Sequence, residues 1–379
     1  ELDYPPFEGI APLDAARSIF EQIAERDILL YHPYESFEST VERFIVDAAG
    51  DPDVVAIKLT LYRSGSQSTI IEALTRAARA GKEVSVFVEL KARFDEERNI
   101  HWAKKLEQAG IHVVYGFVRL KTHAKTTLVV RREGDVVRRY VHVGTGNYNA
   151  ATSTFYTDLG LLTCRGKIGA DLNDLFNEFT GSSRAPRSKF QRLLVAPRRM
   201  RKQFLKLIER EAEHAKAGRG GRIRLKFNGL ADKEMIGALY WASQAGVEID
   251  LIIRGICALR PGVPGLSDRI RVFSLLGRFL EHARIYHFAN GGDPEYYIGS
   301  ADWRPRNLRR RVEVVAPVTD PDACARLDRI LETELDDPYA WQMNADGAYS
   351  RPPAAIGVER RSAQEYWTNQ LGRQQPDNQ

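Results

Sequence analysis

The feature that most constrains the fold is an internal repeat, because the chain contains the same helix, glycine turn and strand twice. Residues 70–93, IIEALTRAARAGKEVSVFVELKAR, correspond to residues 235–258, MIGALYWASQAGVEIDLIIRGICA. Each stretch reads as an amphipathic helix followed by an Ala-Gly-x-Glu turn and an apolar strand. Self-similarity of this kind indicates a duplicated structural unit.

The correspondence continues along the chain in the same order. Strands that alternate with helices are typical of a mostly parallel or mixed sheet covered by helices. We therefore expect an α/β fold of two tandem domains packed about a pseudo-twofold axis. The later segments that correspond are 110–116 with 269–275, 122–130 with 281–288, 140–149 with 296–303, and 157–163 with 311–318.

Length and turn signals predict the domain boundaries. A chain of 379 residues is long enough for two domains with cores of their own. A glycine cluster at 218–221 follows a helical stretch and reads as a helix stop and linker. Near the front, Ser39 and Glu42 form a candidate capping box for a helix that ends at Gly50. The expected division is a lead-in at 1–28, a first domain at 29–185, a linker helix at 186–221, a second domain at 222–342 and a polar tail at 343–379.

The composition argues against several classes of protein. No uninterrupted apolar run is long enough to cross a membrane. The cysteines, Cys164, Cys257 and Cys324, lack metal-ligand spacing, which argues against a disulfide scaffold or a zinc site and fits a reduced cytoplasmic setting. The chain opens on ELDYPPFEG, without an initiator Met or a signal-peptide pattern, so we expect a piece of a longer protein.

The charge is modestly basic and unevenly distributed. The net charge is +5 and the isoelectric point about 9.0. Basic runs at 197–206 and 304–313 suit an anionic partner such as phosphate, nucleotide or nucleic acid, although such runs are often solvated faces. The second run leads directly into an apolar strand, which favours a binding role for it.

A histidine and a cation occur at corresponding places in both copies. His123 and Lys125 lie two positions apart on a predicted strand and therefore project to the same face, and His282 and Arg284 repeat the pattern. One such pair would more often be a surface histidine beside a solvated lysine. If the copies face each other, both pairs converge on one cleft, where a neutral imidazole can attack phosphorus while the cations neutralise the phosphoryl oxygens. The opposite histidine can donate a proton to the leaving oxygen.

Two carboxylates are candidates to orient the imidazoles. An imidazole that acts as a nucleophile needs a partner on its other ring nitrogen to fix its tautomer. Asp158 and Glu313 occupy matching places in the two copies, each within an otherwise apolar strand. They could instead protect the edges of the sheets against unwanted pairing. Their matching positions favour the role of histidine partner.

Tandem H-x-K-like motifs resemble those of the phospholipase D superfamily. That superfamily places an Asp five positions after its Lys, where this chain has Val130 and Ala289. A closer resemblance is to the bacterial polyphosphate kinases, which share this phospholipase D-like fold. It rests on HPYESF, KLTLYR, VELKARFDEERNIHWAKKLEQAG, LKTHAK, HVGTGNYN, YTDLGLLT, RGICALRPGVPGLS, RFLEHARIYHF and SADWRPRNLRRRVEV, which cover most of residues 30 to 318.

The resemblance implies roles for individual residues. ATP would phosphorylate His123, which would pass the phosphate to a growing polyphosphate chain. His282 would be a nucleotide-site residue and an acid–base partner. Tyr156 and Arg254 would contact the nucleotide, since an aromatic ring can stack on a base and a guanidinium can bind phosphate through two hydrogen bonds. A core tyrosine and a surface arginine are the plainer alternatives.

The family also links two arginine positions, here Arg63 and Arg93, to Mg²⁺. A guanidinium offers no lone pair to a metal, so both would hold the phosphates that carry the ion. The glycine-rich 144–149 segment could cradle phosphate or form a tight turn. The arginines of the second basic run would line the polyphosphate path: Arg304, Arg306, Arg309, Arg310 and Arg311.

The expected function is therefore transfer of the terminal phosphate of ATP to polyphosphate, with Mg²⁺ as cofactor. The expected partners are ATP, ADP and polyphosphate, and not nucleic acid. We expect a homo-oligomer for the full-length protein, in the cytoplasm, with peripheral membrane association left open. The alternatives are a phospholipase D-type phosphodiesterase or nuclease, and a non-catalytic module that binds polyanions.

Overall fold

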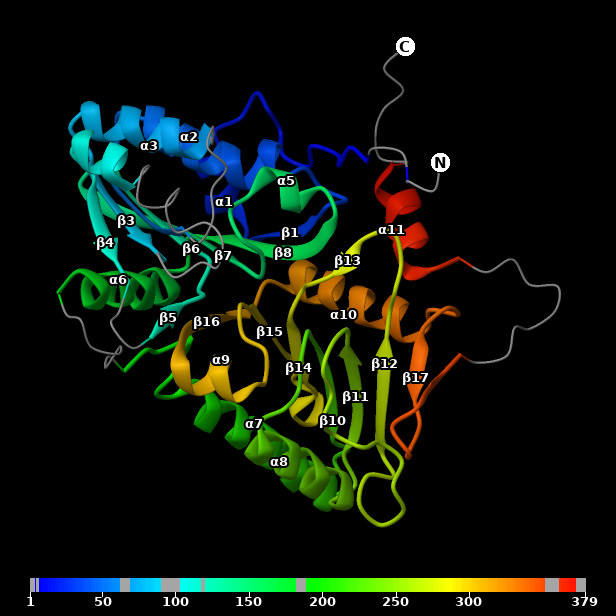
Figure 1. Ribbon diagram of the computed structural model, residues 1–379. Coiled ribbons are helices and arrows are strands. Elements are labelled where there is room, and N and C mark those ends of the chain that lie inside the picture. Colours follow the sequence, from blue (N-terminus) through cyan, green and yellow to red (C-terminus); the bar gives the residue numbers. More distant parts are fainter. Residues whose placement is uncertain are drawn as a thin grey trace.

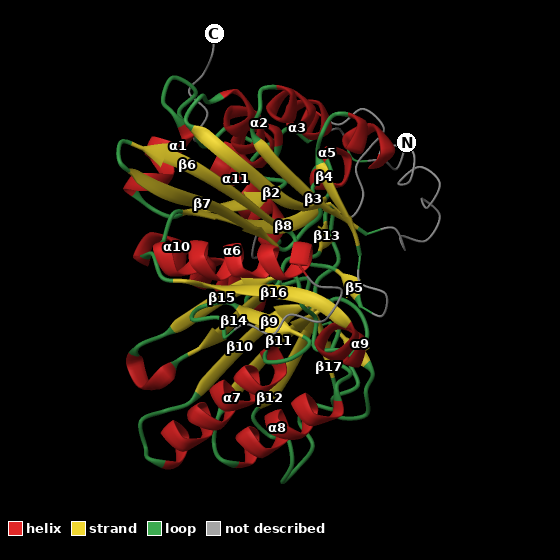
Figure 2. Ribbon diagram, turned by 90° about the vertical axis from the view of Figure 1, so that its left-hand side faces the viewer, coloured by secondary structure: helices red, strands yellow, loops and turns green. Residues whose placement is uncertain are grey.

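The computed structural model describes Tyr4 and residues 7–61, 69–89, 103–116, 120–181, 189–351 and 361–372. Within these residues the chain forms two sheets that face each other across a layer of helices (Figures 1 and 2). Further helices cover the outer face of each sheet. The two lobes of the molecule are these sheets with their helices, and the expected α/β architecture in tandem is confirmed.

The first sheet belongs to the first copy of the repeat. The three strands at one end of the sheet, β2, β3 and β4, are parallel, and the strands on the other side of β2 run antiparallel to their neighbours. The strand order is β1 (Ile28–His32), β8 (Tyr156–Thr163), β7 (Val136–Gly144), β6 (Thr126–Glu133), β2 (Val54–Leu61), β3 (Glu83–Val88) and β4 (His112–Tyr115).

The second sheet repeats this topology. Its strands β10, β11 and β12 are parallel, and β14, β15 and β16 follow antiparallel on the other side of β10, as β6, β7 and β8 follow β2. The repeat seen in the sequence is therefore a repeat of sheet topology. The order is β18 (Tyr349–Ser350), β17 (Trp341–Met343), β12 (Ile270–Ser274), β11 (Glu248–Ile253), β10 (Arg222–Phe227), β14 (Ile285–Phe288), β15 (Glu295–Gly299) and β16 (Arg311–Val318), with β9 (Leu194–Ala196) paired to β16.

The helices form layers on both sides of each sheet. Figure 2 shows α6 and α10 between the sheets, α2 and α3 above the first sheet, and α7 and α8 below the second. Two short helical turns do not belong to these layers of helices. They are the π-helix at Glu38–Glu42 and the 3₁₀ turn at Asn290–Gly292. The helices are α1 (Ile19–Glu25), α2 (Arg43–Gly50), α3 (Thr69–Arg79), α5 (Ala150–Ser153), α6 (Gly166–Gly181), α7 (Met200–Lys216), α8 (Lys233–Gln244), α9 (Pro305–Arg310), α10 (Pro321–Leu335) and α11 (Ala363–Gly372).

Both faces of each sheet are buried, which explains why several strands are almost continuously apolar. Successive residues on a strand point to opposite faces. Leu161 packs in the central core between the sheets, whereas Leu162 packs against the outer helices of the first lobe. In the second lobe, Val314 faces the central core and Val315 faces the outer core under α7 and α8.

Two short strands cross from one lobe to the sheet of the other. β5 (Lys121–Thr122) comes from the first lobe but pairs in parallel with β16 of the second sheet. β13 (Leu280–Glu281) comes from the second lobe but pairs in parallel with β8 of the first sheet. Each crossing strand immediately precedes a histidine of the H-x-K-like motifs, so the exchange positions both candidate catalytic segments.

Two local predictions can be compared directly with the structure. The capping box at Ser39 was wrong: the helical segment begins at Glu38, and Ser36 accepts the Ser39 N–H at 3.2 Å, so Ser39 lies inside the first turn. The stop at Gly50 is confirmed as the last residue of α2. The predicted domain boundaries remain a prediction. No helix among the described residues is long and apolar enough to cross a membrane.

Candidate active site

His123 lies directly after β5, at the boundary between the two lobes. The backbone N–H groups of His123 and Ala124 both donate to the carbonyl oxygen of Val312, at 2.9 and 3.1 Å. This fixes the histidine beside β16 of the second sheet. Its Nδ1 lies 2.8 Å from Oε2 of Glu313 on that strand. The first-copy histidine therefore has a second-copy carboxylate as its partner.

Glu313 is a fully buried carboxylate that several donors hold in place. The Ser300 hydroxyl donates to its Oε2 at 2.5 Å, and the Asn307 amide donates to its Oε1 at 2.7 Å. Burial raises the pKa of Glu313 to about 7, although Lys125 and the Ser300 hydrogen bond act in the opposite direction. Such a carboxylate can orient an imidazole and respond to charge that develops on it.

His282 has the equivalent arrangement with partners from the first lobe. Its backbone N–H donates to Oγ1 of Thr157 at 3.1 Å. Its Nδ1 lies 2.8 and 3.0 Å from the two carboxylate oxygens of Asp158. The Thr145 hydroxyl donates to Oδ1 of Asp158 at 2.5 Å. Burial opposes ionisation of Asp158, but His282 and Thr145 keep the pKa of this carboxyl below its ordinary value.

The two histidines thus exchange partners across the lobes. Sequence reasoning placed Asp158 and Glu313 at matching positions but did not reveal that each would serve the histidine of the other copy. The crossing strands β5 and β13 are the structural cause, because each delivers a histidine to the carboxylate-bearing strand of the opposite sheet. A site of this kind needs both lobes to be complete.

Each motif histidine has a buried cation beside it. Lys125 and Arg284 are each only 2% exposed. Lys125 donates to the carbonyl oxygen of His123, and Arg284 donates to the carbonyl oxygens of His282 at 2.8 Å and Thr145 at 3.2 Å. Each cation also acts electrostatically on the histidine of the other motif. The side chains of the two motifs therefore share one electrostatic environment.

Burial lowers the pKa values of both Lys125 and His123. It lowers the pKa of Lys125 to about 7, with Glu313 opposing the shift and Arg284 and Arg311 adding to it. It also lowers the pKa of His123 well below its ordinary value, assisted by Lys125 and Arg311. His123 is consequently neutral around pH 7, the state that a nucleophilic imidazole requires.

Asp302 is a site residue that sequence reasoning missed. It accepts from Nε of Arg284 at 3.2 Å and from the backbone N–H of Asn228 at 2.9 Å. Burial opposes its ionisation, yet Arg284 and the Asn228 N–H lower the pKa of Asp302 to about 2. The repeat contained a signal for this residue, because Gly-Ser-Ala-Asp at 299–302 aligns with Gly-Thr-Gly-Asn at 144–147. The same alignment pairs Ser300 with Thr145, which were also missed.

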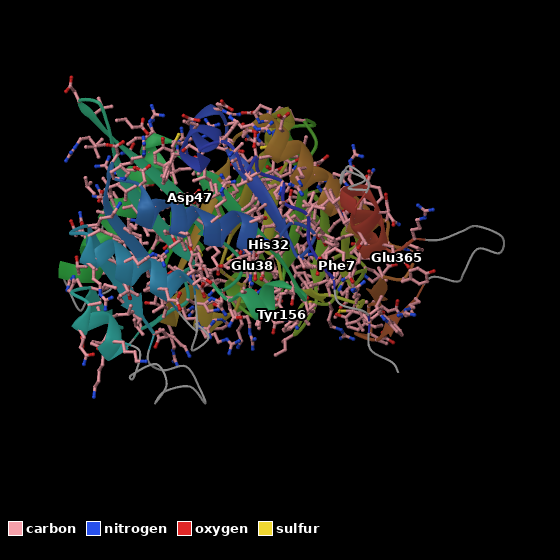
Figure 3. All side chains as sticks on the ribbon, turned by 90° about the horizontal axis from the view of Figure 1, so that it is seen from above. Phe7, His32, Glu38, Asp47, Tyr156 and Glu365 are labelled. Carbon is pink, nitrogen blue, oxygen red and sulfur yellow. The ribbon has the colours of Figure 1, made fainter. Side chains whose placement is uncertain are left out.

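The expected nucleotide contacts gather around His282. The ring of Tyr156 lies 5.1 Å from the ring of His282, centroid to centroid. Nε of Arg254 donates to Oδ1 of Asn228 at 2.9 Å, and Asn228 in turn donates to the carbonyl oxygen of His282 at 3.0 Å. Figure 3 shows Tyr156, at the start of β8, seen from above. The Tyr156 ring therefore lies beside His282, and Arg254 is connected to the His282 backbone through Asn228.

The basic run is divided between ion pairs and a cationic surface. Arg309 donates to Asp232 at 3.2 Å and to Glu234 at 3.3 Å. The pKa of Arg306, by contrast, is lowered by burial and by the neighbouring Arg311 and Arg304. Cations that repel one another in this way favour an anionic ligand between them.

The loop at 144–149 uses part of its backbone internally. The N–H of Gly144 donates to the carbonyl oxygen of Lys125, and that of Thr145 donates to the carbonyl oxygen of Leu159, both at 2.9 Å. These two backbone N–H groups are therefore not available to bind phosphate. At Gly144 and Thr145 this favours the prediction of a tight turn over that of a phosphate-binding loop. A Cβ at Gly146 would come within 2.2 Å of Oδ2 of Asp158, so glycine permits the close approach of loop and carboxylate.

Arg63 and Arg93 lie outside the described residues. Among the residues that are described, no cluster of histidine, cysteine, aspartate or glutamate is arranged to hold a metal ion. Asp158 and Glu313, the carboxylates beside the histidines, already accept hydrogen bonds from imidazole and hydroxyl groups. The described donor set therefore does not fit a metal ion bound by the protein itself.

Comparison with known proteins gives one consistent family. The model "Polyphosphate kinase C-terminal domain 1" matches residues 18–185, and "Polyphosphate kinase C-terminal domain 2" matches residues 193–364. A polyphosphate kinase of Thermosynechococcus vestitus is 58% identical over 347 residues, covering 91% of this chain and 47% of the relative. One of Streptomyces coelicolor is 52% identical over 374 residues, covering 96% of this chain and 50% of the relative.

Solved structures agree with the sequence comparisons. The crystal structure of a polyphosphate kinase from Porphyromonas gingivalis has a TM-score of 0.89 and 40% identity, with 97% of this chain and 56% of that chain covered. A phosphatidylserine synthase of Haemophilus influenzae, at a TM-score of 0.55 and 10% identity over 81% of this chain and 85% of that one, shares the fold alone. The chain spans about half the length of the curated relatives that it matches. With both family models matched in order and this level of identity, the chain belongs to the polyphosphate kinase family.

Proposed function

We propose that this chain is the catalytic region of an ATP:polyphosphate phosphotransferase that works through a phosphohistidine at His123. The observation that carries the proposal is the pairing of each motif histidine with a buried carboxylate of the opposite lobe, beside two buried cations. Membership of the family supports the reaction class. The residue roles below are part of the proposal.

The first half-reaction uses the neutral imidazole of His123. Because burial raises the pKa of Glu313 to about 7, the reactive form is the one with Glu313 ionised: its carboxylate can then only accept, so the hydrogen bond places a proton on Nδ1 and leaves a lone pair on Nε2. Nε2 attacks the γ-phosphorus of ATP, the bond to the bridging β,γ-oxygen breaks, and ADP leaves with that electron pair. Glu313 then stabilises the positive charge on the phosphorylated ring.

The second half-reaction passes the phosphoryl group from Nε2 of His123 to a terminal oxygen of polyphosphate. Lys125 and Arg284 neutralise the charge on the equatorial oxygens during both steps. His282, oriented by Asp158 through Nδ1, gives a proton to the bridging oxygen only as the imidazolium, whose Nε2 also carries a hydrogen, and the Asp158 carboxylate stabilises that charged form. Because the same groups serve both directions, the transfer is reversible.

The ATP is proposed to bind with Mg²⁺ on its phosphates, so the ion arrives with the substrate. Tyr156 stacks on the base and Arg254 binds phosphate beside His282. Arg304, Arg306 and Arg311 contribute to the path of the polyphosphate. Arg63 and Arg93 remain predicted contacts to the Mg²⁺-bearing phosphates.

Several further expectations remain proposals of the same kind. They are the domain division at 29–185 and 222–342 with a linker at 186–221, a homo-oligomeric full-length protein, a cytoplasmic location and peripheral membrane association. The activity of the chain without the remaining half of its relatives belongs with them.

The proposal can be tested by labelling with ATP that carries a radioactive γ-phosphate, in the presence of Mg²⁺. Phosphohistidine is labile in acid and stable in base, so label with those properties on the native chain and none on His123→Ala is the expected result. His112→Ala is a matched control, because His112 is an exposed histidine on β4. Label that persists in His123→Ala, or hydrolysis of a phosphodiester without ATP, would contradict the proposal.

A further inference from the structure

The C-terminal helix α11 packs against the central core near the second histidine. Trp367 is buried there, with its ring 5.5 Å from that of Tyr31 and its Nε1 donating to Oγ1 of Thr333 at 3.0 Å. Most of α11 lies beyond residue 364, where the match to the second family model ends. Figure 3 labels Glu365 on this helix, the residue that follows Gln364 in the sequence.

Gln364 holds the segment before His282 by three hydrogen bonds. Its Oε1 accepts from the backbone N–H of Phe279 at 2.9 Å. Its Nε2 donates to the carbonyl oxygen of Phe279 at 2.9 Å and to Oε1 of Glu281 at 2.6 Å. The side chain is buried, and a Cβ at Gly277 would come within 2.5 Å of Oε1 of Gln364. The loop is therefore shaped to admit this amide.

Glu281 extends the connection to the backbone of His282. Its second oxygen, Oε2, accepts from Nζ of Lys226 at 2.5 Å and from Oγ1 of Thr157 at 2.8 Å. The Thr157 hydroxyl donates its proton to Glu281 in that bond. Oγ1 of Thr157 in turn accepts a hydrogen bond from the backbone N–H of His282 at 3.1 Å. A continuous set of hydrogen bonds thus runs from α11 to His282.

The chemistry of this network is specific to an amide at position 364. A carboxylate at that position could still accept from Phe279, but it would lose both donated bonds and place a second negative charge against Glu281. Lys226 already neutralises Glu281 and also pairs with Glu334 of α10. The surrounding residues therefore require a neutral donor at position 364.

We propose that Gln364 is a positioning residue that, through Glu281 and Thr157, holds the imidazole of His282 against Asp158. The expected effect of Gln364 on the rate of phosphoryl transfer rests on the proposed function, because the role of His282 in that transfer belongs to the proposal. The positioning itself concerns the hydrogen bond from Nδ1 of His282 to Asp158 and can be measured without turnover.

The test compares Gln364→Glu with Gln370→Glu in the full chain of 379 residues. Gln370 lies on the same helix but is exposed, and its side chain donates to the hydroxyl of Tyr366 at 3.3 Å. Two readouts are used: amide hydrogen exchange of residues 279–282, and the ¹⁵N signals of the histidine rings, with that of His282 identified by its loss in His282→Gln. The second readout reports which ring nitrogen carries the proton.

In Gln364→Glu we expect exchange at residues 279–282 to accelerate about tenfold, the effect of losing hydrogen bonds to a buried partner. The His282 signals should shift from the Nδ1–H form toward a mixture of tautomers. Gln370→Glu should change neither. In the double variant Glu281→Gln with Gln364→Glu, the amide at 281 can donate to the carboxylate at 364, so the native signals should be partly restored.

The outcomes separate the two proposals. Unchanged exchange and unchanged His282 signals in Gln364→Glu would overturn the positioning role, and so would a failure of the double variant to restore them in a folded protein. If the native chain forms no phosphohistidine, the proposed function fails while the exchange and ring signals still decide the positioning role. When transfer is active, its rate at saturating ATP should fall several-fold in Gln364→Glu alone.

Discussion

The two halves of the site have the same layout but different electrostatics. Each has a histidine, a carboxylate from the other lobe and a hydroxyl that donates to that carboxylate. Around His123 the cation is Lys125 and the carboxylate is Glu313, and both have pKa values moved to about 7. Around His282 the pKa of Arg284 is raised, although burial opposes its charge, while the pKa of Asp158 is lowered.

This difference fits the proposal that the two half-sites have different roles in the reaction. The half-site of His123 contains groups that can change protonation near neutral pH, which is consistent with the proposal that this half-site carries the chemical step. The half-site of His282 keeps fixed charges, with Asp302 as an additional anion beside Arg284. Fixed charges suit the binding and orientation of a substrate. Under the proposed function, the same duplicated unit would therefore serve two distinct roles.

The largest expected effect comes from the two carboxylates. Glu313→Gln removes the anion that orients His123 and stabilises its charged form, so the rate of phosphohistidine formation should fall on the order of 10³- to 10⁴-fold, as for an orienting carboxylate of a catalytic histidine. Asp158→Asn should reduce the overall transfer by about 10²-fold, the lower range for an acid–base partner. Rapid-quench labelling with γ-labelled ATP measures both rates. Equal losses of rate in Glu313→Gln and Asp158→Asn would contradict the proposed difference between the half-sites of His123 and His282.

A smaller effect is expected from Lys125→Arg, and it depends on pH. Because burial lowers the pKa of Lys125 to about 7, its charge is present below that pH and is lost as the pH rises through it. The KM for ATP of the native chain should therefore increase above about pH 7. Arginine remains charged over this range, so the variant should show a flatter profile. A profile that is identical in both proteins would show that Lys125 does not titrate there.

The smallest effects concern the hydroxyls that donate to the carboxylates. Ser300→Ala and Thr145→Val should each lower the free energy of unfolding by about 1.5–3 kcal/mol, the range for hydrogen bonds to charged groups. Ser300→Ala should be the more costly, because Glu313 is fully buried whereas Asp158 is 7% exposed. Urea denaturation gives both values, and Ser300→Thr and Thr145→Ser keep the hydroxyl as controls. A larger loss in Thr145→Val would reverse the expected order.

Much of the fold and part of the site could be predicted from the sequence. The repeat predicted two sheets of the same topology, and it related His123 to His282 and Asp158 to Glu313. Asp302 escaped notice because its counterpart is Asn147, so the chemical type changes between the copies. Gln364 escaped notice because it lies in a segment that the repeat does not contain and that reads as a polar tail.

The sequence by itself determined which residue types occur twice and at what spacing, since periodic apolar positions and turn residues are local properties of the chain. Only the tertiary structure decided that β5 joins β16 and that β13 joins β8. These pairings join segments that are far apart in the chain, and their register depends on how two buried sheets pack against the helices between them. For that reason the identity of each histidine's partner, and the burial that tunes its pKa, could not be derived from local patterns.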